Sequence, residues 1–154
     1  MTAKDIMSRD VRTVAEDATV AAAARLMHDA PHGALPVIAA DGKVVGMIDR
    51  VTLLRLCLPK YAEDIGDLAF LPPDFTAFEA RIENIAHVPV RDVMRPCDVC
   101  AAEDTPLVEL AALMVLKRVE DVPVLRSERV VGIVGLQDIV DEIVWPHLKH
   151  GEEK

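Results

Sequence analysis

Apolar residues recur with helical spacing in two separate stretches of this chain. They lie mostly three or four positions apart, at Val20, Ala23, Ala24 and Met27 and again at Leu107, Leu110, Ala111 and Met114. This spacing predicts two amphipathic helices, each with one apolar face. Asp104, Thr105 and Pro106 supply cap candidates and a proline for the first position of the second helix. Residues 17–19 supply cap candidates for the first helix without a proline.

Short β-rich runs surround each predicted helix. Extended segments are expected at 11–14, 35–38 and 43–48 and again at 99–102, 122–125 and 129–134. Asp41 and Gly42 join two of these runs, and this pair favours a hairpin turn because both central positions tolerate positive φ.

A second helix is expected to close each half of the chain. Its apolar stripe consists of Leu53, Leu54, Cys57 and Leu58 in the first half and of Ile139, Val140, Ile143 and Val144 in the second. Pro146 is expected to end the last helix, because proline lacks an N–H and clashes with the preceding turn.

The two halves are copies of one repeat. Residues 5–7 (DIM) return at 92–94 (DVM), an offset of 87 residues. The same offset relates 15–17 to 102–104 (AED in both) and 36–37 to 123–124 (PV in both). The run VVG at 44–46 returns at 130–132, so the second copy is one residue shorter, within a turn. One copy of about 50 residues is too small to bury its apolar faces alone, which predicts that the copies pack together as one folding unit.

Composition limits where the protein works and what it binds. With 154 residues, 51% of them hydrophobic, the chain can bury a core, and no apolar run reaches the roughly 18 to 20 residues that span a bilayer. The net charge of −9, from 17 basic and 26 acidic residues, disfavours direct nucleic-acid binding. Three cysteines without a secretion signal fit a reducing compartment, so we expect a cytoplasmic protein.

The order of these motifs resembles the CBS domain family, and the resemblance covers residues 3–58 and 89–145. It implies an α/β (α+β) fold in which two β-α-β-β-α repeats pack through their sheets with pseudo-two-fold symmetry. The corresponding division is repeat 1 at 1–58, an insert at 59–88, repeat 2 at 89–146 and a polar tail at 147–154. The resemblance further implies two clefts that can hold AMP, ADP, ATP or S-adenosylmethionine, and a homodimer.

The family's ligand motif is a glycine, two apolar residues, a Ser or Thr, two variable residues and an Asp. In the family, the backbone amides and the hydroxyl face phosphate, and the carboxylate accepts from the ribose hydroxyls. Residues 132–138 (GIVGLQD) keep Asp138 but carry Gly135 in place of the hydroxyl residue. Residues 46–52 (GMIDRVT) carry Asp49 in place of the hydroxyl residue and Thr52 in place of the Asp.

The cleft of the second copy is therefore the predicted ligand site. Asp138 would bind ribose, and Val122 and Pro123 would form an apolar wall for the base. Cys100 stands where the first copy keeps Thr13, the usual residue of the family. The predicted ligand-binding residues of the two clefts are Asp138, Gly135, Val122, Pro123, Cys100, Thr13, Leu35, Pro36 and Thr52.

Alternatives remain open at both clefts. Asp49 would repel phosphate, so the first cleft could be empty, take a weakly charged adenosine derivative, or depend on Arg50 for compensation. In the second cleft, Asp138 could simply stabilise the N-terminus of a helix.

The segment at 59–88 differs in composition from both repeats. It holds every tyrosine and phenylalanine of the chain, namely Tyr61, Phe70, Phe75 and Phe78. Its acidic residues, Glu63, Asp64, Asp67, Asp74, Glu79 and Glu83, outnumber Lys60 and Arg81. A helix is expected after the break at 71–74 and through Ile85. We expect the aromatic side chains to be buried against the module or at a homodimer seam, and the alternative is a docking surface for a basic partner.

No arrangement of residues points to catalysis. Cys97 and Cys100 form a lone C-x-x-C, and His147 with His150 is too small a set for a structural zinc site, which needs about four ligands. The chain lacks G-x-S-x-G, Walker-type and H-E-x-x-H motifs.

The sequence thus predicts a non-catalytic regulatory module that binds an adenosyl ligand and changes its assembly or the geometry of a regulated protein partner. The alternatives are a ligand-free scaffold acting through the insert and, third, a metal or redox protein.

Overall fold

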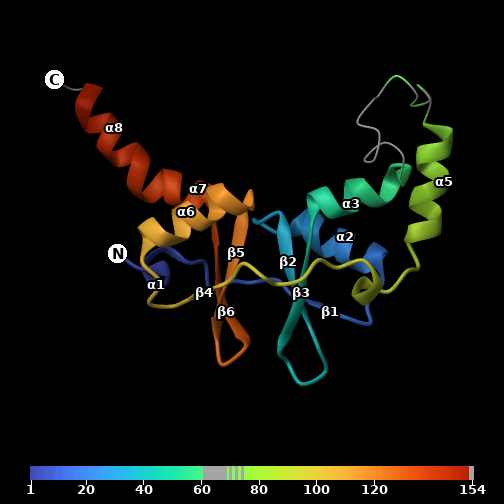
Figure 1. Ribbon diagram of the computed structural model, residues 1–154, viewed down its shortest axis with the longest axis horizontal. Coiled ribbons are helices and arrows are strands. Elements are labelled where there is room, and N and C mark those ends of the chain that lie inside the picture. The colour runs from blue at the N-terminus through green and yellow to red at the C-terminus, as the bar shows by residue number, and fades with distance from the viewer. Residues whose placement is uncertain (61–68, 70, 72, 74, 153–154) are drawn as a thin grey trace.

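Two small sheets stand side by side in the computed structural model, with most helices along one side of them (Figure 1). The structure describes residues 1–60, 69, 71, 73 and 75–152. Its first half contains α1 (Ala3–Ile6), β1 (Val14–Ala15), α2 (Val20–Asp29), β2 (Ala34–Ile38), β3 (Val44–Asp49) and α3 (Arg50–Cys57). Its second half contains η2 (Val90–Asp92), β4 (Ala101–Ala102), α6 (Leu107–Lys117), β5 (Asp121–Arg126), β6 (Arg129–Gly135), α7 (Leu136–Ile139), η3 (Val140–Val144) and α8 (Trp145–Glu152), and α5 (Thr76–Ile85) lies between the halves.

Both sheets have three strands and the same topology, in the orders β1-β2-β3 and β4-β5-β6. The first strand of each runs parallel to its neighbour, and the other two form an antiparallel hairpin. Even the register shift recurs, between Val37 and Ile38 in one sheet and between Val124 and Leu125 in the other. The predicted pair of β-α-β-β-α repeats is confirmed.

The caps of the two long helices differ from each other. Thr19 caps α2 as expected, because its hydroxyl oxygen accepts from the amide of Ala22 at 3.1 Å. In α6, Pro106 is the cap residue and the helix begins at Leu107, one position later than predicted. Thr105 does not cap this helix, since its hydroxyl oxygen accepts from the amide of Ala102 at 2.9 Å.

The first residues of each repeat pack in the core of the other repeat. Ala3 and Met7 belong to the buried cluster formed by β5, β6 and α6, whereas Val90 belongs to the cluster formed by β2, β3 and α2. Backbone hydrogen bonds join Ser8 to Ile133 in both directions at 2.9 and 3.0 Å. The equivalent pair in the other half, Arg95 with Met47, is 2.9 Å in both directions. The two repeats are therefore interleaved through these segments.

The prediction that Pro146 ends the last helix is wrong. Residues 140–144 form a π-helical turn in which the Trp145 amide donates to the Val140 carbonyl, five residues back. Pro146 then lies in the first turn of α8, where a missing N–H costs little, and the helix runs to Glu152. Residues 147–152, expected as a polar tail, are helical.

The predicted apolar stripes of the closing helices face the core only in part. Cys57 and Ile139 are buried. Their stripe neighbours Leu54, Leu58, Val140 and Val144 are exposed. The spacing located apolar faces correctly, but half of each face is turned to solvent in the single chain.

No helix among the described residues is both long enough and apolar enough to cross a bilayer.

Candidate functional site

A cavity of about 440 Å³ opens between the two repeats. Repeat 1 lines it with residues 31–33 and Arg50, and repeat 2 with residues 120–121 and 135–138. The contributing segments are the loop before β2, the start of α3, the start of β5 and the junction of β6 with α7. A neighbouring cavity of about 110 Å³ shares part of this lining and adds Asp49, Arg95 and Arg118.

Asp138 lies in the larger cavity and contacts both repeats. Its Oδ2 accepts from the Gly135 amide at 2.7 Å, which completes the first turn of α7. Nε2 of His32, from repeat 1, lies 3.2 Å from the same oxygen. The Asp138 side chain retains 32% of its exposure, so the carboxylate remains accessible from the cavity. The helix-terminal role and a ligand-binding role are thus compatible.

Asp121, which no sequence motif indicated, is a buried carboxylate of the same cavity. Desolvation raises its pKa, and Glu120 adds to the rise, while His32, Arg50 and a hydrogen bond from the Gly33 amide oppose it. Its Oδ1 lies 3.0 Å from the position that a Cβ on Gly135 would occupy. A Ser or Thr at 135, as in the family's motif, would therefore press against Asp121.

Asp49 begins α3 and is held by three hydrogen bonds. Its Oδ1 accepts from the amide and the hydroxyl of Thr52, both at 2.8 Å, and its Oδ2 accepts from Nε of Arg95 at 2.8 Å. Burial alone would raise the pKa of Asp49, but the hydrogen bonds from Thr52 and Arg95 outweigh it and lower the pKa. The cation that balances Asp49 is thus Arg95 of the other repeat. Arg50, which one alternative gave as the compensating residue, instead lies over Gly33, where a Cβ would overlap its guanidinium group.

The other predicted site residues lie outside both cavities. Val122 and Leu35 are completely buried in the cores of their own repeats, and Pro36 and Pro123 are buried beside them in the strands. Thr13 is half-buried and Cys100 is exposed. Of the predicted ligand-binding residues, the larger cavity brings together Gly135 and Asp138.

The cysteine pair offers no preformed metal site. Burial, with a smaller contribution from Cys100, raises the pKa of Cys97 to about 11, which disfavours the thiolate that binds metals. Among the residues that the structure describes, no group of three or more His, Cys, Asp or Glu side chains is placed to hold a metal ion.

Asp49→Ala is expected to lower the free energy of unfolding by about 1–2 kcal/mol, because it removes the cap of α3. Since folding lowers the pKa of Asp49, its contribution is complete above the ordinary value of 3.8 and is lost as pH falls through the lower folded-state value. Urea unfolding between pH 7 and pH 3 should therefore show the variant approaching the wild type at low pH. Asp49→Asn is the matched control and should lose less, because asparagine also caps helices. A loss of equal size at every pH would contradict this role of the carboxylate.

The geometry defines a class of protein: a tandem-repeat module whose two halves share a polar cleft. The chain belongs to the CBS domain family, whose model matches residues 3–58 and 90–144. It is a CBS domain pair, and such pairs are regulatory modules.

Three proteins illustrate the similarity. Inosine-5'-monophosphate dehydrogenase of Methanocaldococcus jannaschii is 30% identical over 145 residues, which are 94% of this chain but only 24% of that enzyme. Hypoxic response protein 1 of Mycobacterium tuberculosis is 31% identical over 140 residues, covering 90% of this chain and 82% of that protein. The crystal structure of CBSX2 in complex with AMP has a TM-score of 0.70 at 19% identity, covering 95% of this chain and 98% of that one.

Proposed function

We propose that this CBS pair is non-catalytic and binds an adenine nucleotide or another adenosyl ligand in the 440 Å³ cavity, changing its assembly or its contacts with a protein partner. One observation carries the proposal: the carboxylate of the family's ligand motif, Asp138, lies in a polar cavity that both repeats line. CBSX2, which has the same fold, was crystallised with AMP.

The charges of the cavity favour a ligand with few phosphates. Glu120, Asp121 and Asp138 line it, opposed by the guanidinium of Arg50. A triphosphate would bring about four negative charges next to these carboxylates, whereas a monophosphate or a cationic adenosyl ligand would bring fewer or none. We therefore expect AMP or S-adenosylmethionine to bind more tightly than ATP.

The ligand also provides a route to regulation. Ribose hydroxyls that donate to Asp138 would compete with His32 for the same carboxylate oxygen. Because His32 comes from repeat 1 and Asp138 from repeat 2, the exchange of partners would alter a direct contact between the repeats. The size of the resulting shift is limited by the difference in ligand affinity between the two arrangements.

Asp138→Ala is expected to abolish most of the ligand-dependent rise in melting temperature. At a ligand concentration of 100 times Kd, binding to the wild type adds about 2.7 kcal/mol of stability. Loss of a charged acceptor for the ribose hydroxyls should weaken binding about a hundredfold, which would leave about 0.4 kcal/mol. The measurement is thermal unfolding with AMP, ADP, ATP and S-adenosylmethionine up to millimolar concentration. Asp104→Ala is the matched control, since Asp104 is exposed in the turn before α6 and does not line the cavity. Unchanged melting of the wild type with all four ligands would refute the proposal.

The second candidate function is a ligand-free scaffold that binds a basic partner through the insert. The observation that favours it is the exposure of Phe75, at 69%, although its ring makes an edge-on contact with Phe78. Tyr61 and Phe70 lie outside the described residues. Partner binding that does not respond to any adenosyl ligand would distinguish the scaffold from the ligand sensor.

A further inference from the structure

The carboxylate of Asp121 borders the cavity between the repeats but is almost completely withdrawn from solvent. Asp121 lines the 440 Å³ cavity and is only 8% exposed. It begins β5 and pairs with Gly135 at the end of β6. A Cβ on Gly135 would lie 3.0 Å from Oδ1 of Asp121 and 3.4 Å from Oδ2 of Asp138. Two carboxylates therefore border one point of the cavity, beside a residue without a side chain.

Repeat 1 has the same strand pair with the acidic residue on the other strand. Ala34 of β2 pairs with Asp49 of β3, so the small residue and the carboxylate have exchanged places. Asp49 is balanced by Arg95, whose Nε lies 2.8 Å from its Oδ2. The residue equivalent to Arg95 in the other half is Ser8, which carries no charge. Repeat 2 thus has the carboxylate at this strand pair without the arginine that balances it in repeat 1.

The pKa values of the two carboxylates reflect this difference. Burial raises the pKa of both. In Asp49 the hydrogen bonds outweigh burial, and the pKa is lowered. In Asp121 burial prevails over the opposing effects of His32 and Arg50. Glu120 adds to the rise, and the pKa of Asp121 is raised. A further positive charge beside Asp121 would therefore stabilise its ionised form.

A ligand can supply that charge. Among the described residues, no group of three or more His, Cys, Asp or Glu side chains is placed to hold a metal ion, which favours a cation that is part of the ligand. The sulfonium of S-adenosylmethionine is bonded to C5′ of the ribose, whose hydroxyls would donate to Asp138. AMP instead carries a phosphate at C5′, with roughly 1.5 to 2 negative charges near neutral pH, and Asp121 would repel it.

We propose that the cavity selects an adenosyl ligand with a positively charged group at C5′ of the ribose, and that Asp121 is the residue that selects for this charge. The inference rests on the proposed function and deepens it by naming the class of ligand. Asp138 binds the ribose that all adenosyl ligands share, whereas Asp121 distinguishes between their substituents.

Isothermal titration calorimetry with S-adenosylmethionine and S-adenosylhomocysteine tests this selection. The two ligands differ only by the methyl group that makes the sulfur a cation. The wild type should bind S-adenosylmethionine at least about tenfold more tightly than S-adenosylhomocysteine. Asp121→Asn should reduce this ratio to less than about threefold, because asparagine keeps a hydrogen-bond acceptor without the negative charge.

The same substitution should act in opposite directions on two ligands. Asp121→Asn should weaken the binding of S-adenosylmethionine and strengthen the binding of AMP, because it removes an attraction in one case and a repulsion in the other. Damage to the fold would weaken both. Circular dichroism and thermal unfolding without ligand verify that the variant is folded.

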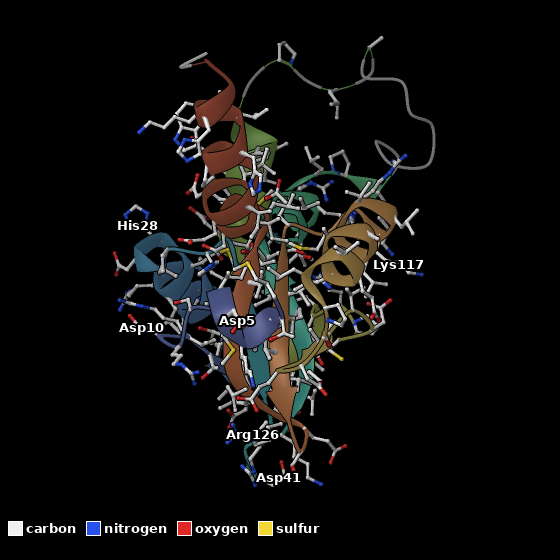
Figure 2. All side chains as sticks on the ribbon, turned by 90° about the vertical axis from the view of Figure 1, so that its left-hand side faces the viewer. Asp5, Asp10, His28, Asp41, Lys117 and Arg126 are labelled. Atoms are coloured by element: carbon white, nitrogen blue, oxygen red, sulfur yellow. The ribbon has the colours of Figure 1, made fainter. Side chains whose placement is uncertain are left out.

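Asp41→Asn is the matched control, because it removes one negative charge outside the cavity lining. Asp41 is exposed in the turn between β2 and β3. Figure 2 shows it at the tip of the hairpins, whereas the cavity lies where the strands join α3 and α7. This variant should keep the wild-type ratio of affinities.

The outcomes separate this inference from the proposed function. If the wild type binds both sulfur ligands equally well, or if Asp121→Asn leaves their ratio unchanged, the inference is wrong while ligand binding in the cavity stands. Tighter binding of AMP than of S-adenosylmethionine to the wild type would also overturn it. If neither sulfur ligand, AMP nor adenosine binds, the proposed function fails and the inference fails with it.

Discussion

Met7→Ala is expected to lower the free energy of unfolding by about 2–5 kcal/mol, the range for truncating a buried methionine. Met7 is only 8% exposed and packs in the core of repeat 2, although it precedes the strands of repeat 1. The reciprocal segment around Val90 packs in the core of repeat 1. Because each repeat is completed by the other, loss of packing at Met7 should destabilise both.

Scanning calorimetry checks the size of this effect and its cooperativity together. One transition is expected for the variant, with equal calorimetric and van't Hoff enthalpies, shifted to lower temperature as a whole. Val108→Ala is the control, because Val108 is 84% exposed on α6 and should change stability by at most about 0.5 kcal/mol. Two transitions, of which only one moves, would show that the repeats unfold independently.

The repeat was the part of the fold that could be predicted from sequence with most detail. The offset of 87 residues predicts matching helices and strands in the two halves, and the two sheets repeat even the position of the register shift. Short apolar runs and helical spacing are local properties, so they can be read directly from the sequence. The exchange of Ala3, Met7 and Val90 between cores is a long-range property, and nothing in the spacing of those residues indicates which core they join.

The same limit applies to the apolar stripes and to the end of the chain. Spacing shows that a helix has an apolar face, but it does not show whether that face is buried in the core. Leu54 and Val140 belong to such faces and are exposed in the single chain. Pro146 was predicted to stop a helix because the prediction assumed an α-helical turn before it. The π-helical turn at 140–144 allows the chain to continue.

In the candidate site, the motif located the residues at the end of β6 but not the residues that face them. Gly135 and Asp138, two residues of the motif in repeat 2, line the cavity. His32 and Arg95 were missed because each acts across the boundary between repeats, which a motif within one repeat does not describe. A usable signal was present in the alignment of the two copies. Asp121 stands opposite Ala34, and Arg95 opposite Ser8, so both charges are particular to the second copy.

Gly132→Val is expected to cost about 1–3 kcal/mol, because a side chain at this position would overlap Met7. The strand β6 approaches the exchanged N-terminal segment very closely here. A Cβ on residue 132 would overlap Sδ and Cγ of Met7 and would lie 3.0 Å from Cβ of Met7. Gly46 is the equivalent position in β3, where a Cβ would lie 2.6 Å from Sδ of Met94 and 2.9 Å from the backbone oxygen of Arg95.

The two glycines should differ in how much stability truncation of the opposing methionine restores to the Gly→Val variant. At Gly132 the obstacles are side-chain atoms of Met7, so Met7→Ala in the Gly132→Val background should restore part of the stability, and the double-mutant cycle should give a favourable coupling of at least about 0.5 kcal/mol. At Gly46 the Arg95 oxygen also obstructs, and it is fixed by its hydrogen bond to the Met47 amide, so Met94→Ala should rescue Gly46→Val less. Urea unfolding of the two cycles measures both couplings. Additive losses in both cycles would mean that the exchanged segments do not press on the strands, and the interleaving of the repeats would then lose its packing basis.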